Sequence, residues 1–128
     1  MKQTTRLFLD QLQGILRTLI SCEGNYQNNY FVLFDFCNAN KSLLLNLNPL
    51  PDNDKAQLLV LLLNIKKRYR EKEYTNRIKC AIAEIVCQML RSIQITDGVY
   101  ENICEIDNAD CLEREVKIRG NNYFIVQC

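Results

Sequence analysis

Histidine and tryptophan are both missing from the 128 residues of this sequence. Because histidine is a common general base and metal ligand, its absence excludes a Ser-His-Asp triad, a Cys-His nucleophile pair, an HExxH zinc helix and a mixed Cys/His finger. The sequence also lacks a P-loop, a dinucleotide-binding fingerprint and a nucleophile elbow. We therefore predict a protein that is not an enzyme and that needs no cofactor.

Long apolar runs are also lacking. The longest, over residues 58–63, is far shorter than the ~20 residues that cross a bilayer. The first 20 residues are interrupted by polar side chains, unlike the apolar core of a signal peptide. We therefore expect a cytoplasmic protein that has no membrane partner and keeps its thiols reduced.

Seven cysteines are present, an odd number scattered along the chain: Cys22, Cys37, Cys80, Cys87, Cys104, Cys111 and Cys128. This distribution does not resemble a disulfide framework. Two pairs are seven residues apart, whereas structural zinc sites use cysteine pairs two to four residues apart. We expect free cysteines that pack as small apolar side chains, and no metal site.

The composition, 48% hydrophobic and 24% charged, is that of an ordinary globular protein, and the length suits a single domain over residues 1–128. Apolar residues at helical spacing predict three helices. The first begins after a cap at Thr4 or Thr5 and ends near Ser21. The others cover residues 52–74 and 77–93.

Two segments have the composition of β-structure. Residues 30–36 are aromatic and β-branched, and residues 42–47 follow a polar turn, so together they predict a β-hairpin. Residues 99–106, 113–119 and 123–126 are separated by turn residues and predict a C-terminal antiparallel meander. The predicted fold class is therefore α+β, with about three helices, a hairpin and a meander.

The predicted helices carry more apolar surface than one stripe each. The first half of the 52–74 helix is apolar on every side, and the 77–93 helix has a second, shorter apolar face. Either the domain packs in three layers, or one face is buried against another chain. We favour the second alternative, a homodimer or another protein complex. The predicted interface residues are Ala83, Cys87 and Leu90.

Although the formal net charge of the whole chain is only +1, two of its segments carry large opposite charges. Residues 55–91 hold nine basic and three acidic residues, net +6, and residues 97–115 hold one basic and seven acidic residues, net −6. If these segments lie apart on the surface, they favour self-association or a charged partner; if they pack together, they neutralise each other.

The basic residues concentrate in residues 66–79, where tyrosines are interleaved with them. As part of a protein interface, four of them form an electrostatic rim: Lys66, Lys67, Arg68 and Arg70. As an alternative, clustered cations with stacking aromatics suit a nucleic-acid-binding regulator. A third interpretation is a solvated helix end with internal charge pairs.

Taken together, these patterns predict a non-enzymatic protein-interaction module, namely an adaptor, inhibitor or small regulatory subunit. We expect it to be a homodimer that uses an apolar helix face rimmed by basic residues.

Overall fold

The computed structural model describes residues 2–22, 26–69 and 77–106, and 82% of these residues are helical. The six helices are α1 (Gln3–Ser21), α2 (Tyr26–Ala39), α3 (Lys41–Leu44), α4 (Asp52–Tyr69), α5 (Arg77–Arg91) and α6 (Asp97–Cys104). No strand occurs within these ranges. The α+β prediction is therefore wrong for this part of the chain, which is all-helical.

Three helices were predicted and are confirmed as α1, α4 and α5, which begin within three residues of the predicted positions. In α1 the buried apolar residues recur at three-and-four spacing, from Phe8 to Leu19. The predicted threonine cap is wrong, because α1 begins at Gln3 after Lys2, with no side-chain cap hydrogen bond.

The predicted hairpin is wrong, because residues 30–36 lie in α2 and residues 42–44 lie in α3. Tyr30, Leu33, Phe36 and Cys37 are buried or half-buried and lie on one side of a helix of 3.6 residues per turn. Aromatic and β-branched residues favour strands only weakly, and tertiary packing overrides that preference here.

The first strand of the predicted meander is also wrong. Thr96 caps α6, and its Oγ1 accepts a hydrogen bond of 3.3 Å from the backbone N–H of Val99. Val99 and Ile103, four residues apart, are both fully buried. Packing of this pair favours a helix. The other two predicted strands fall in residues 107–128, outside the described residues.

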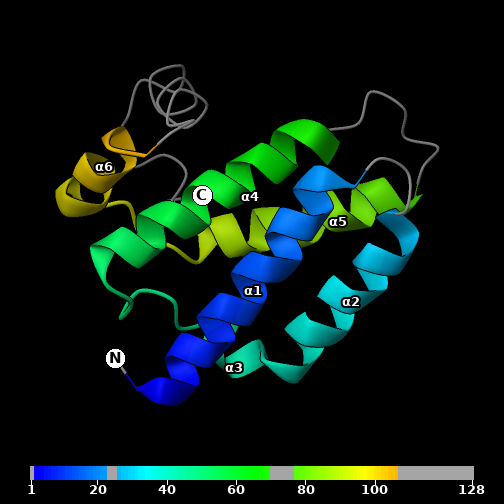
Figure 1. The fold of residues 1–128 in the computed structure, drawn as a ribbon, viewed down its shortest axis with the longest axis horizontal. Coiled ribbons are helices and arrows are strands. Elements are labelled where there is room, and N and C mark those ends of the chain that lie inside the picture. Colours follow the sequence, from blue (N-terminus) through cyan, green and yellow to red (C-terminus); the bar gives the residue numbers. More distant parts are fainter. Residues whose placement is uncertain (1, 23–25, 70–76, 107–128) are drawn as a thin grey trace.

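The helices pack around α4, which contacts α1, α5 and α6 (Figure 1). α2 contacts α1 and α5, so that α1, α4, α5 and α2 form a closed ring of contacts. Because three helices surround it, α4 buries side chains on most of its circumference, including Leu58, Leu59, Leu62 and Ile65. The apolar surface all around this helix is thus covered within the chain itself.

Polar contacts fasten α4 to α1 at both ends. The Arg6 guanidinium lies 2.9 Å from the buried carboxylate of Asp54. At the other end, the Tyr69 hydroxyl donates a 3.0 Å hydrogen bond to the carbonyl oxygen of Leu19. Arg68 donates to the carbonyl oxygen of Cys22. The last turn of α4 therefore satisfies carbonyl groups at the end of α1 that have no partner inside that helix.

Candidate functional site: an apolar groove between α2, α3 and α5

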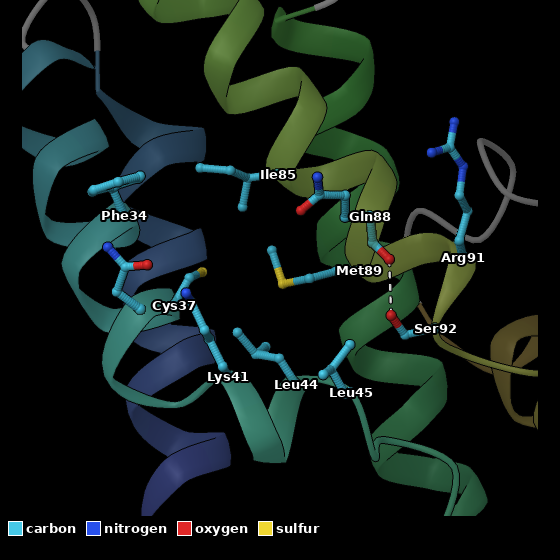
Figure 2. Close-up of a pocket in the computed structure, with 11 residues that line it drawn as sticks. Phe34, Cys37, Lys41, Leu44, Leu45, Ile85, Gln88, Met89, Arg91 and Ser92 are labelled. Atoms are coloured by element: carbon cyan, nitrogen blue, oxygen red, sulfur yellow. Dashed lines mark hydrogen bonds between the residues drawn. The ribbon is translucent and has the colours of Figure 1, made fainter.

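A groove with a volume of ≈ 490 Å³ lies between α2, α3 and α5 (Figure 2). This volume is in the range of pockets that bind ligands or partner side chains. The lining residues are Phe34, Cys37 and Asn38 of α2; Lys41 and Leu44 of α3, with Leu45 after it; and Ile85, Gln88, Met89 and Arg91 of α5, with Ser92 after it.

Apolar side chains form the floor and the walls of this groove. Met89, which is 3% exposed, lies at its centre, with Phe34 and Ile85 at one end and Leu44 and Leu45 at the other (Figure 2). Phe34 is 41% exposed and Leu45 is 81% exposed. Large apolar side chains at such exposure leave apolar surface in contact with water, and its burial by a partner lowers the free energy of the system.

The edges of the groove are polar and carry only positive charge. Lys41 lies on the α2–α3 side, and Arg91 lies across the groove on α5, with its guanidinium directed away from Met89 (Figure 2). Ser92 donates a 2.8 Å hydrogen bond to the carbonyl oxygen of Gln88. None of the described lining residues is acidic. An occupant of this groove is therefore expected to be apolar, with a carboxylate at its margin.

Cys37 is a thiol in the wall of the groove. Burial raises its pKa to about 11, because the surrounding apolar side chains disfavour the thiolate. At neutral pH Cys37 is protonated, so it contributes an apolar surface to the groove and is a poor nucleophile.

A second hollow, with a volume of ≈ 520 Å³, lies between α1 and α2. Gly14 lines it, and no atom lies within 4 Å of the position that a Cβ would take there. Gln11, Thr18 and Asn29 give this hollow a more polar lining than that of the α2–α3–α5 groove. It adjoins the exposed Val32 but contains no charged residue among those described.

The interface residues predicted from the sequence lie elsewhere on α5. Ala83 and Cys87 are half-buried, and at ~100° per residue they lie about 200° around the helix from Ile85 and Met89. Leu90 is 4% exposed and belongs to the chain's own core. The structure therefore brings none of the three to the groove.

The predicted basic rim is only partly on the surface. Lys66 is half-buried, Lys67 and Arg68 are exposed, and Arg70 lies outside the described residues. Arg68 binds the Cys22 carbonyl, and its guanidinium carbon lies 5.9 Å from the centroid of the Tyr69 ring. Its contacts are thus those of a residue that joins α4 to α1, and it lies apart from the groove.

Sequence reasoning missed Phe34, Leu45 and the groove itself. Phe34 lies within the predicted strand 30–36, and Ile85 and Met89 lie within the predicted helix 77–93, away from the apolar face proposed as the interface. The pattern that could have indicated the site is the inner stripe of residues 30, 33, 36 and 37, which leaves Phe31 and Phe34 on the outside.

Other kinds of site find no support in the part of the chain that the structure describes. It contains no group of three or more Cys, Asp or Glu residues that could hold a metal ion. None of its helices has both the length and the apolar character needed to cross a membrane.

Comparison with protein-family models, with curated proteins and with solved structures finds no match to this chain.

Proposed function

We propose that the protein is a non-enzymatic protein-interaction module, an adaptor, inhibitor or small regulatory subunit, and that its binding site is the α2–α3–α5 groove. The observation that supports this most is the exposure of Leu45, at 81%, and of Phe34, at 41%, at opposite ends of a groove whose floor is made by Met89. Apolar grooves between helices bind amphipathic segments that insert large side chains at helical spacing.

The dimensions and chemistry of the groove favour a helical segment as its occupant. The lining is apolar along its length from Phe34 and Ile85 to Leu44 and Leu45, so successive apolar side chains of one helix face can insert along it. Lys41 and Arg91 flank the lining and can hold a carboxylate at the edge. The thiol in the lining, Cys37, is a poor nucleophile, because burial raises its pKa.

The test is selection of helical peptides from a random displayed library on the immobilised protein. We expect enriched peptides to carry two or three large apolar residues on one helix face. Their affinity should fall by at least ~10-fold for Leu45→Asp, which places a charge in the groove.

The matched control is Leu7→Asp, because Leu7 is 58% exposed on α1 and does not line the groove. This variant should bind the selected peptides as the wild-type protein does. Peptides that bind Leu45→Asp as tightly as wild type would contradict the proposed function, as would a selection that enriches no peptide on protein that is monomeric under the selection conditions.

A further inference from the structure

The outer face of α2, beside the groove, projects two aromatic side chains. Phe31 is 51% exposed and Phe34 is 41% exposed. Both rings lie against Tyr30, with centroids 5.4 Å and 5.8 Å from the Tyr30 ring, so they form one aromatic ridge. The apolar groove and the aromatic ridge therefore lie next to each other on the same surface of the protein.

The same surface also carries exposed charges of both signs. Asp35 is exposed on α2 between the positions of the ridge residues and Asn38, and Lys41 is exposed at the start of α3. In the ranges that the structure describes, the two ion pairs join Arg6 to Asp10 and to Asp54. Asp35 and Lys41 are therefore available to pair across an interface.

We infer that the occupant of the groove is α2 of a second copy of this chain, so that the protein forms a two-fold symmetric dimer through its α2–α3 surface. This inference rests on the proposed function, because it names the partner of the same groove. A two-fold interface uses the same patch on both copies. The aromatic ridge of each copy must therefore face the groove of the other copy, and each charged side chain must face a charge of opposite sign.

An antiparallel crossing of the two α2 helices at Asn38 meets these conditions. Asp35 lies on α2 just before Asn38, and Lys41 begins α3 just after the turn at Asn40, on the same groove as Asn38. In the proposed crossing, Asp35 of each copy therefore approaches Lys41 of the other. Phe31 lies two turns before Asn38 on α2, and Leu45 lies after α3 at the end of the groove, so the ridge of each copy is directed into the groove of the other. One register thus places both the apolar groups and the charges opposite their complements.

A second copy matches this surface better than an unrelated helix does. An unrelated amphipathic helix that occupies the α2–α3–α5 groove covers its lining residues. It leaves Phe31 and Asp35 of α2 facing water, because these two residues lie outside the lining. In the dimer the apolar ridge is also buried, and each copy contributes one charge to each of two symmetric ion pairs. Burial of an aromatic side chain near the centre of an interface is a common source of binding free energy.

The experiment is sedimentation equilibrium in reducing buffer at micromolar concentrations, for the wild-type protein and for Asp35→Lys and Lys41→Asp. We expect the wild type to dimerise. Each variant alone should dimerise at least ~10-fold more weakly, because it opposes like charges in both ion pairs.

An equimolar mixture of the two variants is the decisive sample. In a mixed dimer, one copy is basic at both positions 35 and 41 and the other copy is acidic at both, so both pairs again have opposite signs. The mixture should therefore recover a dimer with an affinity close to that of the wild type. All substituted side chains are exposed, and Leu7→Asp serves as the control that leaves dimerisation unchanged.

The inference is overturned if the wild type is monomeric, or if the mixture dimerises no better than either variant alone. A monomeric protein that still binds selected peptides through Leu45 overturns the dimer and leaves the proposed function standing. A dimer that survives Leu45→Asp, in a protein that binds no peptide, contradicts both.

Discussion

Leu45 and Leu90 provide a direct test of whether the groove is a binding surface or part of the folded core. Both are leucines in apolar surroundings, but Leu45 is 81% exposed and Leu90 is 4% exposed. Leu45→Asp should change the free energy of unfolding of the monomer by no more than about 0.5 kcal/mol, because most of its side chain already contacts water.

Leu90→Ala should be far more costly. Truncating a buried leucine removes the transfer free energy of the lost methyl groups and leaves a cavity, together about 2–5 kcal/mol. We expect a loss of about 3 kcal/mol, which is a large part of the roughly 5–15 kcal/mol that stabilises a typical domain. With a urea dependence of ~1.5 kcal/mol/M, the unfolding midpoint should fall by ~2 M.

The assay is urea unfolding followed by circular dichroism at several protein concentrations. Since dimerisation adds stability by mass action, the wild-type midpoint should rise with concentration and that of Leu45→Asp should not. If Leu45→Asp costs more than ~2 kcal/mol at low concentration, or if Leu90→Ala costs less than ~1 kcal/mol, the division between surface and core is refuted.

Further predictions concern three individual side chains. Gly14→Ala should raise the free energy of unfolding by up to ~1 kcal/mol in urea titrations, because the new methyl group meets no atom within 4 Å and alanine favours a helix; a loss of stability would contradict this. Tyr69→Phe should lower it by about 1 kcal/mol, because the buried Leu19 carbonyl loses the hydroxyl donor and is left with the weaker thiol donor of Cys22 at 3.4 Å, and an unchanged unfolding midpoint would contradict the tyrosine hydrogen bond. Burial and hydrogen bonding to Cys22 raise the pKa of Tyr69 from 10.0 to about 12, so in the wild type its contribution is complete below pH 10 and is lost as the pH rises towards 12; stability that stays constant over this range, measured against Tyr69→Phe, would argue against it. Alkylation of Cys37, followed by mass spectrometry, should be slower than that of the exposed Cys104 at pH 7 and should increase up to about pH 11; equal rates at pH 7 would exclude the buried, protonated thiol.

Three helices of the fold could be predicted from the sequence, because their apolar residues recur at helical spacing or because no helix breaker interrupts them. In α1 and α5 the buried side chains recur at helical spacing, and in α4 the absence of any helix breaker was sufficient. The sequence did not predict α6 as a helix, because Asp97 and Gly98 usually form turns. Here Thr96 uses the same turn to cap a helix that buries Val99 and Ile103.

The candidate site could not be predicted, because it depends on α2 being a helix. Only a helix places Phe34 and Cys37 opposite Ile85 and Met89 of α5. Residues 30–36 are aromatic or apolar on both faces except for Asp35, so the inner stripe was hidden by the exposed side chains. The residues that obscured the secondary structure are thus the same ones that form the candidate interface.

The contrast between α4 and α2 is the physical reason for proposing a partner at α2. Both helices carry apolar side chains on more than one face, which is a pattern of helices buried on several sides. α4 has α1, α5 and α6 around it, and these cover its apolar surface. α2 contacts α1, α5 and the short α3, and still leaves Phe31 and Phe34 exposed. The ring of helices within one chain therefore covers the apolar surface of α4 but leaves Phe31 and Phe34 of α2 exposed, and these are the side chains that the proposed second copy would bury.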